Sequence, residues 1–198
     1  PDVKLVRNGS RGMIWLEPLV EVQEGDGPRM AYGPATAADI PAILDGTSDK
    51  ALGPTEDLPW MKRQTRLTFQ RVGVIDPLCL RDYEAHGGLV GLRRALEMTG
   101  AEIVTEVTDS GLRGRGGAGF PTGIKWNTVA GAEATQKYIV CNADEGDSGT
   151  FADRMLMEGD PFTLIEGMII AGLAVGATRG YVYLRSEYPD AIEVMQEA

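Results

Sequence analysis

The sequence has few of the side chains that most often carry out catalysis or hold metals. Its 198 residues include one histidine, His86, and two cysteines, Cys79 and Cys141, which lie far apart in the chain. An iron–sulfur cluster usually takes four cysteine ligands, so two separate cysteines exclude such a cluster from this chain. Cysteines without an evident disulfide partner are typical of a reducing compartment. We therefore expect a cytoplasmic protein in which His86 and Cys141 have structural roles.

Positive charge and long apolar runs are also scarce. The chain has 19 lysines and arginines against 29 acidic residues, a formal net charge of −10. This excess of negative charge argues against binding to nucleic acid or to anionic membranes. The most apolar stretch, Leu164–Ala177, contains Glu166 and is shorter than the roughly 20 residues that cross a bilayer. The sequence therefore predicts no direct insertion into a membrane.

Glycine, by contrast, is concentrated in one segment, residues 111–126. Six of these sixteen residues are glycine, and three others are the cations Arg113, Arg115 and Lys125. Glycine lets backbone N–H groups come close to a ligand, and consecutive N–H groups form an anion-binding nest. Phe120 and Trp126 lie in the same segment. We predict that this segment binds a flat, phosphorylated cofactor.

Three alternative interpretations of the glycine-rich segment fit less well. A flexible linker is rich in glycine and serine but lacks arginine and aromatic residues. Residues 114–119 match Gly-x-Gly-x-x-Gly, yet the dinucleotide fingerprint must follow a strand, whereas the spacing of apolar residues in 103–112 predicts a helix. The Gly-Lys-Ser/Thr ending of a kinase-type P-loop is missing after Gly123. The sequence therefore favours a phosphate cradle outside the ordinary Rossmann pattern.

A second segment places carboxylates after a predicted strand. Lys137–Asn142 is a short apolar run with β-forming residues, and Asp144, Glu145 and Asp147 follow it. Ligands of open α/β sheets bind beyond the carboxyl ends of the strands, where carboxylates suit ribose hydroxyls, ring N–H groups or a carboxamide. Alternatively, the segment is an acidic turn in which Thr150 and Asp153 cap the next helix. The residues by themselves leave both options open.

Together, these segments resemble the family of flavin- and NAD-binding subunits shared by complex I, NAD-reducing hydrogenases and NAD-dependent formate dehydrogenases. The motifs Gly114–Gly123 and Asn142–Glu145 carry the resemblance, which spans roughly residues 73–198. Three further stretches most resemble the formate dehydrogenase beta subunit, with the hydrogenase diaphorase subunit next: 7–12, 15–22 and 147–151.

The resemblance implies a diaphorase that transfers hydride between NAD(H) and FMN and exchanges single electrons with iron–sulfur clusters. FMN would lie on the glycines, with Lys125 near its phosphate or ring edge, and Asn142 and Asp144 would hold the ribityl chain and ring. NAD(H) would stack against Phe120, while Glu145 and Asp147 orient its ribose or carboxamide. No residue acts as a catalytic acid or base or as a metal ligand. The implied cofactor-binding residues are Gly114, Arg115, Gly116, Gly117, Ala118, Phe120, Lys125, Asn142, Asp144, Glu145 and Asp147.

The chain also differs from the family pattern. Family members carry a second glutamate-rich flavin loop, a ubiquitin-like module and a cysteine quartet for a four-iron four-sulfur cluster, and none of these is in this sequence. Asp147 replaces a glutamate of complex I members, and Thr128 a frequent aromatic. We therefore expect a fragment of a longer subunit. Its implied partners are a thioredoxin-like, gamma-type iron–sulfur subunit and a molybdenum catalytic subunit. The alternatives are a hydrogenase or complex I diaphorase and a flavin-less interaction scaffold.

The expected fold class is α/β. Residues 63–198 would form the N-terminal part of a Rossmann-like FMN- and NAD-binding domain. Residues 1–62 would be the end of a smaller α+β module, with a thioredoxin-like fold as one option, plus a linker. The strand–helix order after residue 137 predicts a parallel sheet. The pattern predicts strands at 3–7, 13–22, 137–142 and 180–185, a turn at Asn8-Gly9, an extended stretch at 64–74, and helices at 39–44, 82–98, 101–110, 151–158, 161–175 and 189–198.

Overall fold

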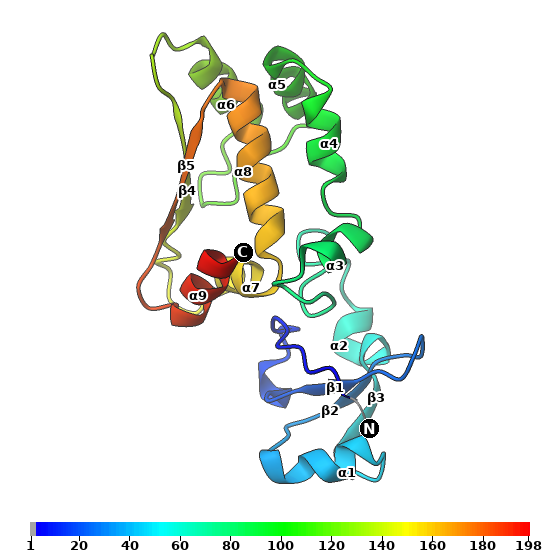
Figure 1. Ribbon diagram of the computed structural model, residues 1–198. Coiled ribbons are helices and arrows are strands. Elements are labelled where there is room, and N and C mark those ends of the chain that lie inside the picture. The colour runs from blue at the N-terminus through cyan, green and yellow to red at the C-terminus, as the bar shows by residue number, and fades with distance from the viewer. Residues whose placement is uncertain (1–2) are drawn as a thin grey trace. The chain divides into compact units, whose positions relative to one another are not determined.

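The computed structural model describes residues 3–198 and divides the chain into two compact units (Figure 1). One unit is Ser10–Gln70. The other is Arg71–Ala198 together with the N-terminal segment up to Gly9. The domain boundary after residue 62, which the sequence suggests for the full-length protein, stays a prediction.

The smaller unit is built on a three-stranded antiparallel sheet with the order β1-β2-β3. Its core consists of Tyr32, Ala35 and Ile43, which are buried against one another. A capping box between Thr36 and Asp39 begins the helical stretch that delivers Ile43 to this core. The elements are η1 (Ile14–Leu16), β1 (Val20–Val22), β2 (Met30–Tyr32), η2 (Ala37–Asp39), α1 (Ile40–Leu44), β3 (Ala51–Pro54), η3 (Thr55–Asp57) and α2 (Pro59–Lys62).

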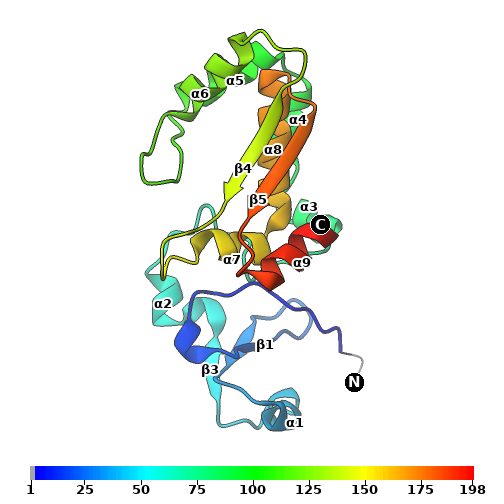
Figure 2. The same cartoon turned by 90° about the vertical axis from the view of Figure 1, so that its left-hand side faces the viewer.

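The larger unit is arranged around one apolar helix, α8. This helix packs against two parallel strands on one side and against α4 and α5 on another (Figures 1 and 2). Because α8 is apolar nearly all round, it is stable only when neighbouring elements cover most of its surface. The elements are α3 (Leu80–Ala85), α4 (Val90–Leu96), α5 (Gly100–Asp109), α6 (Thr122–Gly131), β4 (Tyr138–Ala143), α7 (Ala152–Gly159), α8 (Pro161–Val175), β5 (Arg179–Leu184) and α9 (Pro189–Glu197).

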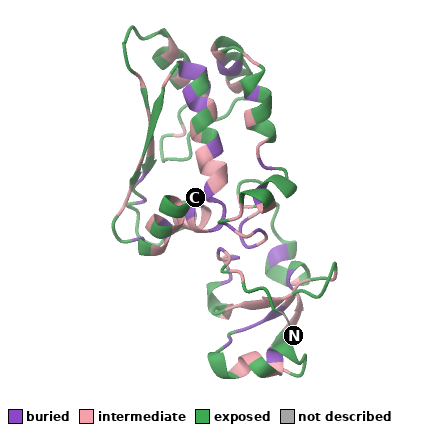
Figure 3. Ribbon diagram, in the orientation of Figure 1, coloured by how far each residue is buried: buried purple, intermediate pink, exposed green. Residues whose placement is uncertain are grey.

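The two strands of this unit run side by side in a regular parallel register. Tyr138 pairs with Arg179 at one end and Ala143 with Leu184 at the other. Along β4, and along β5 from Tyr181 onward, exposed residues alternate with partly or fully buried ones (Figure 3). The exposed face carries Tyr138, Val140, Tyr181 and Tyr183. Parallel sheets are normally covered on both faces, whereas the described residues leave this face of the β4–β5 sheet exposed.

A buried polar network ties α8 to residues 71–92. The Glu166 carboxylate accepts hydrogen bonds from the hydroxyl of Tyr83 and from the backbone N–H groups of Leu89, at 2.8 Å, and Leu92, at 2.9 Å. Burial by itself raises the pKa of Glu166, but these hydrogen bonds outweigh it and lower the pKa below its usual value. Burial and the bond to Glu166 raise the pKa of Tyr83 to about 12. The ionised carboxylate thus holds the start of α4, where Leu89 is left-handed with φ of 64°.

Most predicted elements after residue 100 are confirmed. The structure has the helices α5, α7, α8 and α9, the strands β4 and β5, and their parallel pairing. The helix near residues 39–44 is also present as α1, and the α/β class is confirmed. The sequence pattern does not predict α6, because only Trp126 and Ala130 of that helix pack against the core and its glycines resemble loop residues.

The predictions for the N-terminal part were largely wrong. Residues 3–13 form no helix or strand, and only Val20–Val22 of the second predicted strand is one. Gly9 lies in no hairpin turn. It packs against Gly159, where an added Cβ would lie 2.5 Å from the Gly159 Cα. The alternating pattern of residues 3–7 therefore does not correspond to a sheet.

Two further expectations fail within residues 64–98. Residues 64–74 form turns, without a strand. The helix predicted at 82–98 is divided into α3 and α4, because Gly87, with φ of 82°, and Leu89 turn the chain between them.

Candidate cofactor-binding site

The glycine-rich segment forms a closed loop, residues 111–121, between α5 and α6. The Thr122 N–H donates to the Leu112 carbonyl at 2.9 Å, and the Gly114 N–H donates to the Phe120 carbonyl at 2.8 Å. The Arg113 Nε also donates to the Gly119 carbonyl at 2.6 Å. The loop is therefore shaped by its own hydrogen bonds, and Arg113 has a structural part in it. A helix precedes it, so the rejection of an ordinary strand-initiated Rossmann turn agrees with the structure.

The middle of the glycine loop is open. A Cβ added to Gly116 or Gly117 would meet no other atom within 4 Å, and one added to Gly114 would meet the Phe120 carbonyl at 3.6 Å. Arg115 and Ala118 are also exposed. Packing within the described chain does not require glycine at 116 and 117. An exposed, side-chain-free backbone beside a cation fits the close approach of a phosphorylated ligand.

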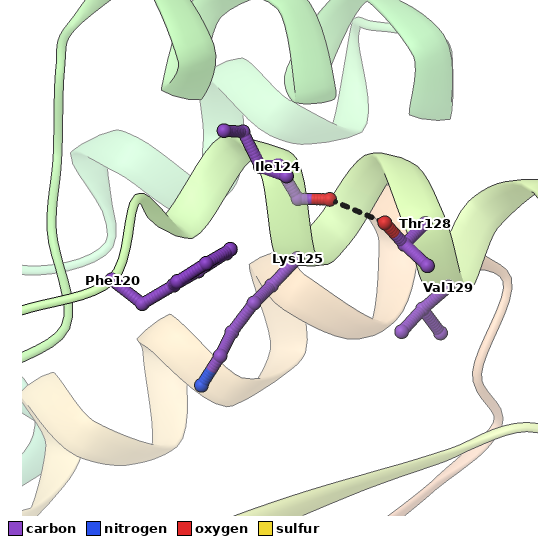
Figure 4. Close-up of a pocket in the computed structure, with 5 residues that line it drawn as sticks. All are labelled: Phe120, Ile124, Lys125, Thr128 and Val129. Carbon is purple, nitrogen blue, oxygen red and sulfur yellow. Dashed lines mark hydrogen bonds between the residues drawn. The ribbon is translucent and has the colours of Figure 1, made fainter. Parts of the chain in front are cut away.

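Beside the loop, α6 carries an open hollow of about 460 Å³. Its lining residues come from the end of the loop and the first two turns of the helix: Phe120, Ile124, Lys125, Thr128 and Val129. The Lys125 side chain extends beside the Phe120 ring, while the Thr128 hydroxyl donates to the Ile124 carbonyl at 2.8 Å (Figure 4). The Phe120 ring is 46% exposed. An exposed aromatic ring next to an ammonium group suits a flat ligand that carries negative charge.

The acidic segment, residues 144–147, follows β4 at the carboxyl end of the sheet. Glu145 is only 7% exposed, and both of its carboxylate oxygens are engaged. One accepts the Asp153 N–H at 3.0 Å, and the other accepts the Arg154 N–H at 3.3 Å and the Tyr188 hydroxyl at 3.1 Å. Glu145 therefore caps the start of α7 from the far side of the loop that joins β4 to this helix.

The interpretation of the acidic segment as a helix cap is partly right. The segment does cap the next helix, but through Glu145. Thr150 makes no capping bond, since α7 begins after Phe151, which is left-handed with φ of 56° and has no side-chain cap. Burial raises the pKa of Asp153, and the nearby Glu145 raises it further.

The remaining carboxylates of the segment are available to a ligand. Asp144 and Asp147 are exposed, and within residues 3–198 neither carboxylate accepts a hydrogen bond. The Asn142 side-chain oxygen accepts the Asp144 N–H at 3.2 Å, which fixes the beginning of the segment. In Figures 1 and 2 the tip of the glycine loop lies at the level of the carboxyl end of β4. The predicted residues thus form two groups, the glycine loop with α6 and the acidic segment with Asn142.

The residues that hold the acidic segment are not among those predicted from the sequence. Arg185 and Tyr188 follow β5, the strand next to β4, and both bond to Glu145. Burial raises the pKa of the Tyr188 hydroxyl, and its bond to Glu145 adds to the effect. The sequence could have indicated Arg185 and Tyr188 by their position after a predicted strand, because the carboxyl ends of adjacent parallel strands share one edge of a sheet.

Comparison with known proteins places these features in a family context. Residues 107–198, which include every predicted cofactor-binding residue, match the sequence model of the family described as Nuo51 FMN-binding domain. The chain is 56% identical over 137 residues to the HndC subunit of an NADP-reducing hydrogenase from Solidesulfovibrio fructosivorans, covering 69% of this chain and 28% of that subunit. It is 54% identical over 131 residues to an NADH-quinone oxidoreductase subunit of Rhizobium meliloti, covering 66% of this chain and 31% of that protein.

A solved structure shows the same relationship. The NAD+-reducing [NiFe]-hydrogenase in its air-oxidized state superposes with a TM-score of 0.52 and 29% identity, covering 84% of this chain and 28% of the hydrogenase chain. The chain thus spans less than a third of the length of these relatives. Within the described residues, no helix is long and apolar enough to cross a membrane, and no cluster of side chains could hold a metal ion.

Proposed function

We propose, on the premise that residues 107–198 belong to the Nuo51 FMN-binding domain family, that the full-length protein is the diaphorase subunit of a multisubunit NAD-linked oxidoreductase. The observation that carries the proposal is the family match over a glycine loop whose central backbone is open to a ligand. FMN, when bound, supplies a group that takes two electrons as hydride from NADH and releases them one at a time to iron–sulfur clusters. The residues of the chain itself have to bind FMN and NAD(H) and orient them toward each other.

The glycine loop and its neighbours are proposed to hold FMN. Gly116 and Gly117 offer backbone N–H groups without side chains in the way, and Gly114 and Ala118 flank them. Arg115 and Lys125 supply positive charge for the phosphate, since both are exposed beside the loop. The Asn142 amide and the Asp144 carboxylate, at the carboxyl end of β4, suit the hydroxyl and N–H groups of the ribityl chain and ring.

The hollow on α6 and the acidic segment are proposed to receive NAD(H). The exposed Phe120 ring offers a stacking surface. Asp147 is free to accept hydrogen bonds from ribose hydroxyls or a carboxamide. Glu145, whose oxygens are already engaged by α7 and Tyr188, contributes by anchoring the segment that carries Asp144 and Asp147.

The assembly that we propose is an NAD-dependent formate dehydrogenase of the cytoplasm. Residues 7–12, 15–22 and 147–151 support it, because they resemble the formate dehydrogenase beta subunit. Its partners would be a thioredoxin-like gamma-type iron–sulfur subunit and a molybdenum catalytic subunit, with a four-iron four-sulfur cluster in the full-length chain. The named relatives are hydrogenase and quinone oxidoreductase subunits, so a hydrogenase or complex I diaphorase is the alternative.

The test is to purify the full-length protein with its natural partners. We expect flavin absorbance, ferricyanide reduction by NADH, and NAD+ reduction when formate is added. Reduction of NAD+ by hydrogen, without formate activity, would assign the hydrogenase alternative. A complex without flavin and without NADH oxidation would show that the protein is an interaction scaffold.

A further inference from the structure

We infer that Arg185 and Tyr188 are positioning residues that hold the acidic segment in place for its ligand. The inference rests on the proposed function, because it assigns the support of the same binding site. Both residues lie in the turn that follows β5, here called the Arg185–Tyr188 turn, and both contact the segment that follows β4. Neither residue belongs to the glycine loop or to the acidic segment itself.

Tyr188 anchors the acidic segment from within the protein. Its side chain is 6% exposed, and its hydroxyl donates to the Glu145 carboxylate at 3.1 Å. The ring belongs to the core cluster formed with Ala143, Met157 and Ala191. Because the ring is packed on three elements, the position of its hydroxyl is fixed, and so is the carboxylate that accepts from it.

Arg185 holds the backbone of the same residue. Its guanidinium donates to the Glu145 carbonyl and lies over the Tyr188 ring, 5.1 Å from the ring centroid. Arg154 lies near the same ring at 5.7 Å. Cation–π contacts of this kind fix the guanidinium where it meets the carbonyl. Glu145 is thereby held at its carbonyl and at its carboxylate by one turn.

The segment needs such support because its own sequence does not order it. Gly146 and Gly149 lie within it or just after it, and Gly149 has φ of 83°. Fixing the backbone of each residue in such a segment costs conformational entropy. If the segment is already ordered in the free protein, less of that cost falls on ligand binding. The Arg185–Tyr188 turn therefore pre-organises the exposed carboxylates of Asp144 and Asp147.

The test compares Tyr188→Phe with Tyr183→Phe in the full-length protein and its complex. Tyr188→Phe keeps the ring and its packing and removes one buried hydrogen bond. Tyr183 lies on the preceding strand, is 66% exposed, and serves as the matched control. We expect Tyr188→Phe to raise the KM for NADH about tenfold through Asp147, with kcat near wild type, and to lower flavin content, because the same turn holds Asp144. Amide hydrogen exchange of residues 144–150 should also be faster. Arg185→Gln should act in the same direction.

Several outcomes would overturn the inference. An unchanged KM for NADH in Tyr188→Phe, or a lower melting temperature with unchanged KM, would leave the turn with a stabilising role only. An equal rise in Tyr183→Phe would show that the effect is not specific to the turn. A wild-type complex without flavin and NADH oxidation would overturn the proposed function as well, whereas an active wild type with an unaffected Tyr188→Phe variant would overturn the positioning role alone.

Discussion

Glycine occupies positions 116 and 123 for different physical reasons, although the two positions are only seven residues apart. At Gly116 a Cβ would meet nothing within 4 Å, whereas at Gly123 it would lie 2.2 Å from the Thr108 Oγ1. The first glycine is not explained by packing within the described chain, and the second is explained fully by it. Replacing each residue therefore tests a different property of the protein.

Replacement of Gly116 with valine should remove flavin from the purified full-length protein and leave its melting temperature near wild type. The reason is that the new side chain projects into the space where the loop backbone approaches the ligand. Flavin absorbance per mole of protein is the measurement. Gly131→Val is the control, because Gly131 ends the helix that follows the loop and is equally open. Stoichiometric flavin in Gly116→Val would contradict the cradle.

Substitutions of Lys125 and Phe120 should affect the binding of different cofactors. Lys125→Ala removes a charge-assisted contact worth about 1.5–3 kcal/mol, and the purified enzyme should be depleted in flavin. Phe120→Ala removes a stacking surface worth about 0.5–1.5 kcal/mol beyond its area, and should raise the KM for NADH at near-normal flavin content. Flavin content and steady-state kinetics are measured on both variants. Equal loss of flavin in both would refute this assignment of roles.

At the scale of elements, the contact between α5 and α6 determines where the glycine loop begins and ends. Gly123 lies in the first turn of α6 and touches Thr108 near the end of α5. The hydroxyl of Thr108 bonds back to the Val104 carbonyl at 2.7 Å, so it has no free direction in which to yield. The close approach of the two helices thus brings the ends of the loop together.

Gly123→Ala should destabilise the protein by about 1–3 kcal/mol, because its Cβ would also lie 2.6 Å from the Thr108 Cα, a backbone atom. Urea unfolding followed by circular dichroism measures the change. Gly131→Ala in the same helix, with open space around it, should have a small effect. Equal stability of the two variants would show that the helices can separate at little cost.

Glu166 should make stability depend on pH. Its pKa is lower in the folded protein than its usual value near 4.5, because the hydrogen bonds from Tyr83, Leu89 and Leu92 outweigh burial. Its stabilising effect is therefore present above that usual value and is lost as the pH falls through the lower, folded value. Wild type should lose unfolding free energy more steeply than Glu166→Gln below about pH 4.5.

Urea unfolding of both proteins from pH 7 to pH 3 is the measurement. At pH 7, Glu166→Gln should be less stable by about 1–3 kcal/mol, because one acceptor of a buried set is lost. Parallel pH profiles for the two proteins would mean that Glu166 does not titrate differently on unfolding.

At the scale of the whole molecule, the surfaces of the larger unit do not by themselves enclose a ligand. The hollow on α6 is lined by five residues from one loop and one helix, and one face of the β4–β5 sheet is exposed. Small-molecule sites usually bury most of the ligand surface. The described residues supply one side of such an enclosure.

The isolated 198-residue chain should therefore bind FMN weakly or not at all, and it should not reduce ferricyanide with NADH. Fluorescence titration with FMN and a steady-state assay are the measurements. The full-length protein, assayed alongside, is the positive control. Appreciable NADH-dependent reduction by the isolated chain would mean that one side of the enclosure is sufficient.

Sequence and structure agree best where local patterns and long-range packing act in the same direction. β4 and β5 combine β-forming residues with a buried face toward α8, and both were predicted within one residue at each end. Residues 3–7 alternate in the same way, but they lack a partner strand, and Gly9 is used to pack against Gly159. Alternation without a partner does not produce a strand, because the backbone hydrogen bonds of a strand are made with its neighbour.

The sequence by itself determined the chemistry of the two segments: an open, cationic glycine loop and carboxylates after a strand. Only the tertiary structure decided which of those groups are available. It brought Tyr188 and Arg185 to Glu145 from 40 or more positions away, and left Asp144 and Asp147 exposed. The physical reason is that a residue type defines what bonds a side chain can form, whereas the pairing of β4 with β5 defines which partners reach it.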